Sequence, residues 1–458
     1  MAATLALLTG LAAGSAGCSV PGSSGPGPTP DQSSTAGPTP ASDPRPAKPL
    51  GWGPDQNDAE AAGKAVAGMS LEQKAGQVLL PFFAGLDAEA HAGIAERLHL
   101  AGSIVLGDNV RATPYGQVTM GPADPTIGSR SISGSADTAA EFGAAFSRGM
   151  LDSGVLPAAK HFPGHGSVTV NSHEGLPVQS ASLEQLRAKD LKPFQAAIDA
   201  GLPMVMTGHI AVPALQPGVP ASVSKAAYAE LRRMGFKGVA VTDAMNMGAI
   251  ERQFPDDAAA PLALAAGADL VLMPASVETA HAAIVSAVRS GSLPAARLDE
   301  VAQRVATMQL WRARSHPPEG RASGSGAALS EKVSQEAITV VAGPCRGPIV
   351  PASVRVSGGT EQDRARFAAA AKEAGVGIGN GPLVTLIGYG GSPAAADVAV
   401  ALDAPWPLEK SAAPAKIALY GRSQEAFDVL LAVLAGRATA LGKLPVAVGP
   451  HGPGSGCG

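Results

Sequence analysis

The sequence predicts an α/β fold, in which a TIM-type (β/α) barrel is followed by a smaller α/β sandwich domain. Short apolar segments, typical of buried strands, alternate along the first two thirds of the chain with longer segments of helical pattern. Polar residues directly follow the predicted strands, at Lys160, His161, His209 and Asp243. Polar groups at the carboxyl ends of parallel strands are typical of a barrel.

The elements of the first domain can be placed in chain order. A helix is expected to begin after Ser70, which is a suitable N-cap because Gln73 stands at the capping-box position. The predicted strands are residues 102–106, 155–159, 204–206, 238–241 and 269–273, and the predicted helices are residues 136–153, 183–200, 224–234, 257–267, 276–290 and 296–313.

A Gly/Ser/Ala-rich segment at residues 316–330 is expected to link the barrel, residues 51–315, to the C-terminal domain, residues 331–458. The predicted elements of the second domain are strands at 337–342, 382–387, 397–401 and 416–419 and helices at 361–374 and 424–435. Cys345 and Cys457 either form a disulfide or stay free, and the sequence favours neither.

The N-terminal residues have the pattern of an exported protein. A short apolar run ends in Ser-Ala-Gly before Cys18, which resembles a bacterial lipobox with Cys18 as the lipidated residue. Residues 1–18 are therefore expected to be a lipoprotein signal peptide. The Pro/Ser/Gly-rich residues 19–50 would form a disordered tether to the outer face of the cell membrane. The alternative is an apolar tail, because no Lys or Arg precedes Arg45.

The charge of the chain gives no sign of a nucleic-acid partner. Its 34 basic and 38 acidic residues leave a net charge of −4, without the basic excess that a phosphate backbone would attract. The histidines between 161 and 173 lack the spacing of a metal site, and no phosphate-binding glycine loop is present. No cofactor is expected.

Two motifs carry candidate chemistry. Residues 160–166 read K-H-F-P-G-H-G and are followed by Asn171 and His173, while residues 241–248 read V-T-D-A-M-N-M-G around Asp243. Both motifs resemble those of family 3 glycoside hydrolases of the β-N-acetylglucosaminidase type. The family's first motif is K-H-F-P-G-H-G-x-x-x-x-D-S-H, so Asn171 replaces its aspartate.

The resemblance implies the roles of the catalytic residues. Asp243 would be the nucleophile of a retaining mechanism, and His173 the acid/base. The alternatives are that Asp243 caps a helix and that His173 is an inert loop residue. Asn171 would orient His173 through its amide oxygen but supplies no charge, so a slow enzyme is expected.

The same resemblance implies a substrate site. Lys160, His161 and Arg130 would hydrogen-bond the sugar, and Arg130 lies in a segment similar to the family's I-G-x-R-S-F. His209 is expected either to bind substrate or to have a structural role. The alternative for Arg130 is a solvated surface charge, and His165 is expected to brace the loop.

One family segment is missing. The pattern D-Q-E-G-G-x-V-x-R does not occur here, and the connection before Gly128 leaves about 20 residues where two units of roughly 30 residues each would be expected. The barrel should therefore lack a strand–helix unit.

The expected function is that of a monomeric exo-β-N-acetylglucosaminidase, attached to the membrane only through its lipid anchor. It would release terminal N-acetylglucosamine from β-N-acetylglucosaminides such as muropeptides. Two alternatives stay open. One is a β-N-acetylglucosaminide phosphorylase, since a histidine acid/base tolerates an anionic acceptor better than a carboxylate would. The other is a catalytically impaired sugar-binding lipoprotein.

Overall fold

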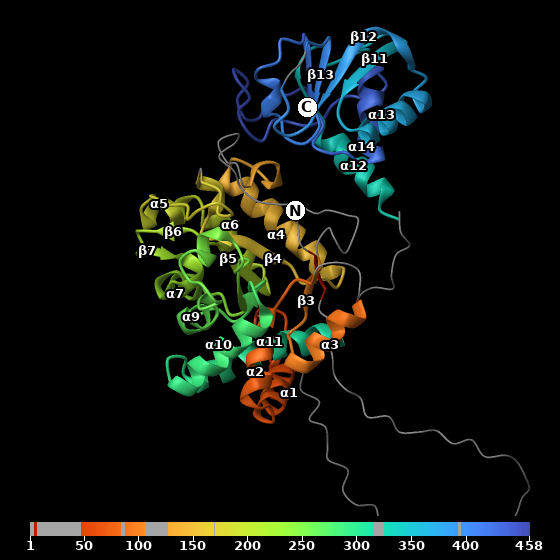
Figure 1. Cartoon of the computed structure of the whole chain (residues 1–458). Helices are drawn as coiled ribbons and strands as arrows, with labels where there is room; N and C mark the ends of the chain where they lie inside the picture. Colours follow the sequence, from red (N-terminus) through yellow and green to blue (C-terminus); the bar gives the residue numbers. More distant parts are fainter. Residues whose placement is uncertain are drawn as a thin grey trace, which may run out of the picture.

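A computed structural model describes residues 4–6, 47–83, 88–105, 127–168, 170–315, 325–392 and 395–458. Cys18, the rest of the predicted signal peptide beyond residues 4–6, and the predicted tether up to residue 46 lie outside the described residues. Within this described part, no helix combines the length and the apolar character needed to cross a membrane. The helices and strands gather into an N-terminal and a C-terminal α/β part (Figure 1).

The N-terminal part is built on parallel strands. Pairs and single bridges connect the strands in the order β3–β2–β9–β8–β5–β4. Their bounds are β2 (Leu79–Leu80), β3 (Ser103–Val105), β4 (Ala158–Phe162), β5 (Met204–Thr207), β8 (Val239–Thr242) and β9 (Val271–Leu272). Among the described residues, β3 and β4 are not paired with each other, and β3 instead pairs antiparallel with β1 (Thr4–Ala6).

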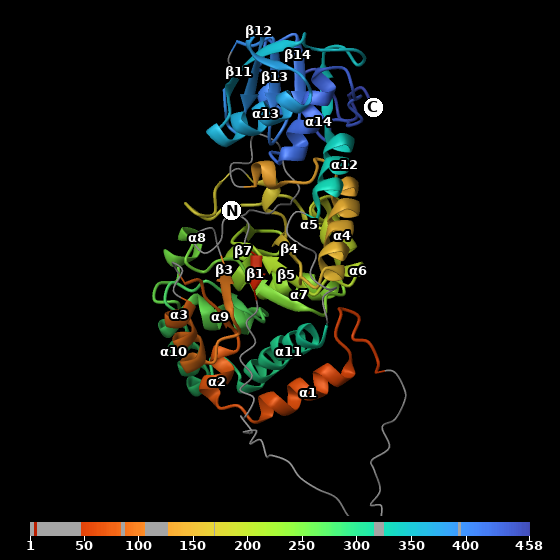
Figure 2. The same ribbon diagram turned by 90° about the vertical axis from the view of Figure 1, so that its right-hand side faces the viewer.

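Helices surround these strands, and Figure 2 shows α1 and α11 packed side by side. The helices are α1 (Gln56–Ala67), α2 (Leu71–Gly76), α3 (Ala88–Leu98), α4 (Ala136–Asp152), α5 (Leu183–Ala188), α6 (Lys192–Asp199), α7 (Lys225–Arg233), α8 (Gly248–Glu251), α9 (Ala259–Ala266), α10 (Val277–Ser290) and α11 (Ala295–Arg314). A small hairpin, β6 (Ala211–Val212) and β7 (Gln216–Pro220), follows β5. The predicted capping box of Ser70 and Gln73 is confirmed at the start of α2.

Two predicted elements of this part differ from the structure by more than two residues or in their number of helices. The strand expected at 155–159 is β4, which begins at Ala158 and includes Lys160 and His161, because pairing with β5 continues to Phe162. The helix expected at 183–200 is divided into α5 and α6. Pro193 stands in the first turn of α6, where a proline is tolerated because the backbone N–H there has no helical partner.

The C-terminal part contains a five-stranded sheet in the order β10–β14–β13–β12–β11, with only β10 antiparallel to its neighbour. Separate buried clusters lie on the two faces of the sheet. The bounds are α12 (Ala327–Ala337), β10 (Thr339–Ala342), β11 (Ser353–Gly358), α13 (Glu361–Glu373), β12 (Gly377–Ile387), β13 (Val398–Ala401), β14 (Ala415–Ala418) and α14 (Gln424–Leu434). The linker expected at 316–330 is wrong from residue 327 on, where α12 begins.

A disulfide joins Cys345 to Cys457, with the two Cα atoms 5.4 Å apart. The pairing that the sequence left open is therefore formed. It connects the loop after β10 to the end of the chain.

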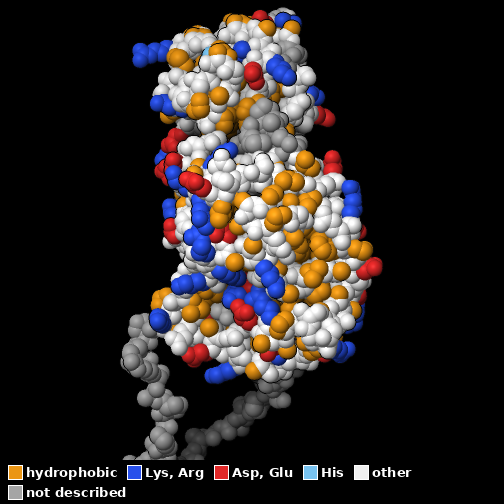
Figure 3. Space-filling view, turned by 90° about the vertical axis from the view of Figure 1, so that its left-hand side faces the viewer, with side chains coloured by type: hydrophobic (Ala, Val, Ile, Leu, Met, Phe, Trp, Pro, Cys, Tyr) orange, Lys and Arg blue, Asp and Glu red, His pale blue; other side chains and the backbone are white. Residues whose placement is uncertain are grey.

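The surface carries charges of both signs. On the face of the molecule drawn in Figure 3, Lys and Arg side chains are interspersed with Asp and Glu side chains, and hydrophobic atoms cover much of the area between them. This mixture agrees with the net charge of −4 of the chain.

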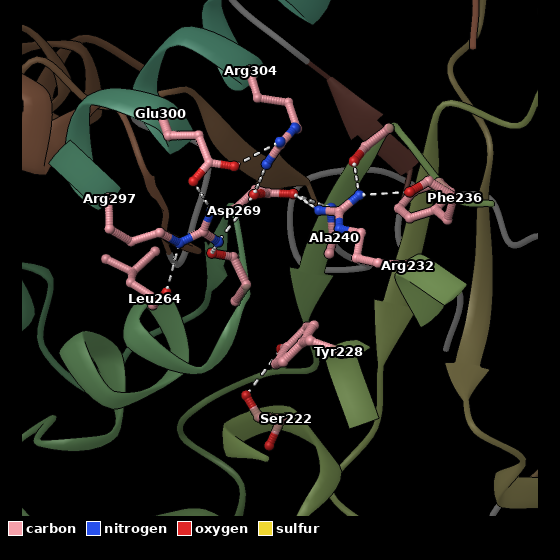
Figure 4. Close-up of polar contacts among 12 residues, drawn as sticks. Ser222, Tyr228, Arg232, Phe236, Ala240, Leu264, Asp269, Arg297, Glu300 and Arg304 are labelled. Atoms are coloured by element: carbon pink, nitrogen blue, oxygen red, sulfur yellow. Dashed lines mark hydrogen bonds and ion pairs between the residues drawn. The ribbon is translucent and has the colours of Figure 1, made fainter. Parts of the chain in front are cut away.

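A buried ion cluster holds the amino ends of β8 and β9 against two helices (Figure 4). Asp269, just before β9, is fully buried and contacts three arginines. The carboxylate lies 2.6 Å from Arg232 of α7, and 3.2 and 2.5 Å from Arg297 and Arg304 of α11. It also accepts a hydrogen bond of 2.8 Å from the backbone N–H of Ala240 in β8. One carboxylate thus connects two strands and two helices.

Replacing this carboxylate should destabilise the N-terminal part. We expect Asp269→Asn to lower the free energy of unfolding by about 3 kcal/mol, because it leaves three guanidinium groups without their shared counter-charge. Urea unfolding followed by tryptophan fluorescence measures this. The control is Asp299→Asn, which removes an exposed pair with Lys74 and should cost about 1 kcal/mol or less. Equal urea midpoints for the two variants would contradict the stabilising role of Asp269.

Candidate active site

The candidate site lies where β4, β5 and β8 end. Thr207, the last residue of β5, pairs with Phe162 of β4 on one side and with Thr242 of β8 on the other. The carboxyl ends of the three strands therefore meet at one edge of the sheet. This arrangement brings Lys160 and His161 close to Asp243, as the sequence predicts.

Asp243 is an almost buried carboxylate, 8% exposed. Its Oδ1 accepts a hydrogen bond of 2.9 Å from the backbone N–H of Ala244, and its Oδ2 lies 3.5 Å from His161 Nε2. Burial raises the pKa of Asp243, but His161, His209, Lys160 and the Ala244 N–H outweigh this effect and lower the pKa to about 2. The Asp243 carboxylate is therefore ionised at neutral pH, and it lies directly after the end of β8.

The helix-cap alternative for Asp243 is excluded. The next helix, α8, begins at Gly248, and Met247 is its N-cap residue, without a capping side chain. The Asp243 carboxylate instead bonds to the residue directly after it. The Asp243 side chain therefore does not cap a helix, although its position between a strand and a helix is typical of a cap.

Burial lowers the pKa of both β4 residues that lie beside Asp243. Burial lowers the pKa of His161 well below its ordinary value, although Asp243 raises it, so the imidazole is neutral. Burial also lowers the pKa of Lys160, opposed by Asp243 and assisted by Arg130. Lys160 is therefore close enough to both groups to experience their charges.

Of the two roles that the sequence left open for His209, substrate binding and a structural role, the contacts in the structure favour the structural one. His209 is fully buried, and both of its ring nitrogens are used within the protein. Nδ1 lies 2.8 Å from Ser222 Oγ, and Nε2 lies 2.8 Å from the carbonyl oxygen of Ala244. His209 thus holds the backbone next to Asp243, and no ring nitrogen is left for a sugar. Burial lowers the pKa of His209, which keeps the imidazole neutral.

His173 and Asn171 form a pair on the loop after β4. The His173 side chain is exposed, and its Nδ1 lies 3.0 Å from Asn171 Oδ1, which also accepts the backbone N–H of His173 at 3.0 Å. Because an amide oxygen only accepts, His173 donates from Nδ1 and its Nε2 remains available for proton transfer. Asn171 therefore selects a tautomer through its oxygen, without supplying a negative charge.

Arg130 ends a short 3₁₀ turn, η2 (Gly128–Arg130), that touches the C-terminal part. A Cβ atom built on Gly128 would lie only 2.3 Å from the hydroxyl oxygen of Tyr389, so the tyrosine packs directly against this glycine. Nearby, Ser133 Oγ donates a hydrogen bond of 3.3 Å to the carbonyl oxygen of Pro445. Tyr389 could not be associated with the site from the sequence, because 259 positions separate it from Arg130.

The described residues include no group of three or more His, Cys, Asp or Glu side chains that could hold a metal ion.

Comparison with known proteins identifies the family. The profile described as "Glycosyl hydrolase family 3 N terminal domain" matches residues 70–308, which is more than half of the chain. This range includes Asp243, His173 and all the substrate residues considered above.

Named relatives agree with that match. Beta-hexosaminidase LpqI of Mycobacterium bovis is 36% identical over 214 residues, covering 44% of this chain and 55% of LpqI. The chain thus matches about half the length of this curated relative.

Among solved structures, a glycoside hydrolase family 3 beta-N-acetylglucosaminidase from Paenibacillus has a TM-score of 0.73 at 21% identity, covering 83% of this chain and 99% of that one. Beta-glucoside phosphorylase BglX has a TM-score of 0.70 at 17% identity, covering 86% and 97%. Both likenesses concern the fold.

Proposed function

The chain belongs to glycosyl hydrolase family 3, and on that premise we propose that it is a retaining β-N-acetylhexosaminidase. It would release terminal β-linked N-acetylglucosamine from cell-wall fragments such as muropeptides. The observation that carries the proposal is the ionised, nearly buried carboxylate of Asp243 at the end of β8, beside His161 and Lys160. The similarity to LpqI, a protein named a beta-hexosaminidase, supports the choice of sugar.

The proposed mechanism has two steps. Asp243 attacks the anomeric carbon and forms a covalent glycosyl-enzyme, while protonated His173 gives its Nε2 proton to the leaving oxygen. A water molecule then attacks the anomeric carbon, His173 takes up a proton from it, and the bond to Asp243 breaks. With its pKa lowered to about 2, Asp243 is ionised at neutral pH, which is the form that attacks the anomeric carbon.

Three cationic or neutral donors would hold the sugar. Lys160 and His161 lie close enough to the Asp243 carboxylate to experience its charge, and Arg130 lies close enough to affect Lys160 and His161. N–H donors in this arrangement suit the hydroxyl groups of a sugar ring, and neutral His161 can donate without competing for the charge of Asp243.

We further propose that the parallel strands are an open (β/α) barrel that lacks one strand–helix unit. The strand order β3–β2–β9–β8–β5–β4 supports this proposal, as does the short connection of about 20 residues before Gly128, where a single unit needs roughly 30. A crystal structure in which β3 and β4 are joined through two further parallel strands would contradict it.

We also propose that the protein is exported and attached to the outer face of the cell membrane through a lipid on Cys18. The lipobox-like sequence supports this, and the Cys345–Cys457 disulfide is typical of an oxidising compartment. The expected result is that the full chain partitions into the detergent phase of a Triton X-114 extract, and that Cys18→Ala moves it to the aqueous phase. Aqueous partitioning of both proteins would refute the anchor.

The activity is tested with 4-nitrophenyl β-N-acetylglucosaminide, with and without inorganic phosphate. We expect the purified protein to release nitrophenol and free N-acetylglucosamine, and Asp243→Ala to lose at least about 1,000-fold in kcat, because residues 238–250 contain no other carboxylate that could form the covalent intermediate. The control is Asp299→Ala on α11, far along the chain from the site motifs. If Asp243→Ala keeps a tenth of the activity, Asp243 is not the nucleophile. A sugar 1-phosphate product would identify a phosphorylase, and binding without turnover an impaired enzyme.

Restoring a carboxylate at residue 171 should accelerate the reaction. We expect Asn171→Asp to raise kcat about tenfold or more and to extend the basic limb of the pH profile to higher pH, because a carboxylate 3.0 Å from Nδ1 favours the imidazolium that donates the proton. The matched control is Asn380→Asp, on the exposed strand residue of β12. An unchanged pH profile would mean that residue 171 does not govern the charge of His173.

A further inference from the structure

The segment that carries His173 is fastened by a buried hydrogen bond between two neighbouring side chains. Ser172 Oγ lies 2.9 Å from His165 Nε2, and each of these residues is only 1% exposed. His165 begins a 3₁₀ turn, η3 (His165–Ser167), shortly after β4, and its ring centroid lies 5.7 Å from that of His161. The residue directly before His173 is therefore tied to the strand that carries Lys160 and His161.

The turn η3 is itself anchored to the next helical layer. Ser167 Oγ donates a hydrogen bond to the carboxylate of Asp190, between α5 and α6. A Cβ atom on Gly164 would lie 2.6 Å from the Cβ atom of Asp190, so the backbone before η3 is packed against the same residue. His165 is thus a fixed point and not part of a freely moving loop.

On its other side, the His173 segment contacts the helix that follows the nucleophile. The carbonyl oxygen of Ser172 accepts a hydrogen bond of 3.3 Å from the backbone N–H of Ala249 in α8. A Cβ atom on Gly248 would lie 2.8 Å from the carbonyl oxygen of His173, closer than a Cβ atom tolerates. Gly248 does not have a positive φ, so the requirement for glycine here is one of space and not of backbone conformation.

We propose that Ser172 and Gly248 are positioning residues that set the place of His173 relative to Asp243. Ser172 fixes the segment to His165, and the missing side chain at Gly248 allows the His173 backbone to approach α8, five residues after Asp243. The exposed imidazole then depends on these buried contacts for its distance from the leaving oxygen. This inference rests on the proposed function, in which His173 is the acid/base.

The dependence of the rate on the leaving group tests the proposal. Phenol is a poor leaving group that needs protonation by His173, whereas 4-nitrophenol leaves with little help. For Ser172→Ala and Gly248→Ala, we expect kcat/KM to fall about tenfold or more with phenyl β-N-acetylglucosaminide but much less with the 4-nitrophenyl substrate, since a misplaced acid loses proton transfer first. Ser172→Thr, which keeps the hydroxyl group, should retain most of the rate with both substrates.

The matched controls are Ser153→Ala, whose hydroxyl bonds within the end of α4, and Gly93→Ala, which has open space in α3. Neither should alter the ratio of the two kcat/KM values. Equal losses with both substrates, or no loss, in Ser172→Ala and Gly248→Ala would overturn this inference while leaving the proposed function standing. Absence of hydrolysis by the unsubstituted protein with either substrate would instead overturn the proposed function.

Discussion

The N-terminal part depends on how one buried charge is compensated. Asp269 has no exposed surface, and an ionised carboxylate removed from water is costly unless opposite charges and hydrogen bonds replace the lost hydration. Three arginines and a backbone amide supply that replacement, and they come from α7, α11 and β8. The two helices are thereby fixed at the amino ends of the strands, and this leaves the carboxyl ends free to carry polar side chains.

Asp243, which follows β8 in the same set of strands, has a different environment from that of Asp269. It is nearly as deeply buried as Asp269, yet no guanidinium group is paired with it among the described ion pairs: the Ala244 N–H donates to it, the His161 imidazole lies 3.5 Å away, and Lys160 and His209 act on it through their charge or dipole. A carboxylate saturated by guanidinium groups is a poor nucleophile, because its lone pairs are occupied. Asp269, at the amino ends of the strands, therefore stabilises the fold, whereas Asp243, at the carboxyl ends, keeps lone pairs that are not bound by guanidinium groups.

The sequence predicted most elements because their patterns are local. Apolar strands and helices with caps at Ser70 or Ser276 are decided by neighbours within a few residues, and the structure has them within a few positions. The start of β4 was misplaced because pairing with β5, not local composition, determines which residues join the strand. The elements that were not predicted are the strands β1, β2, β6, β7 and β11 and the helices α1, α3, α8 and α12. Of these, α12 has no buried residue, so no buried apolar stripe marks it.

Only those residues of the candidate site that lie in recognisable sequence motifs could be predicted. Lys160, His161 and Asp243 meet because strand ends meet, which alternating strands and helices already imply. The role of His209 stayed open because the sequence does not reveal that Ser222 and the Ala244 carbonyl oxygen occupy both of its ring nitrogens. Tyr389 could not be found, since its contact with Gly128 joins two parts of the chain that share no local pattern.

The disulfide between Cys345 and Cys457 makes the stability of the C-terminal part depend on oxidation. Cys345 and Cys457 are 112 positions apart, so the bond encloses nearly the whole five-stranded sheet in a covalent ring. A ring of that size limits the unfolded chain strongly enough to contribute about 4 to 5 kcal/mol in the chain-entropy description. In a reducing compartment the same residues lack this contribution. The C-terminal part thus reaches its full stability only once this disulfide has formed, so its stability depends on the redox state of its surroundings.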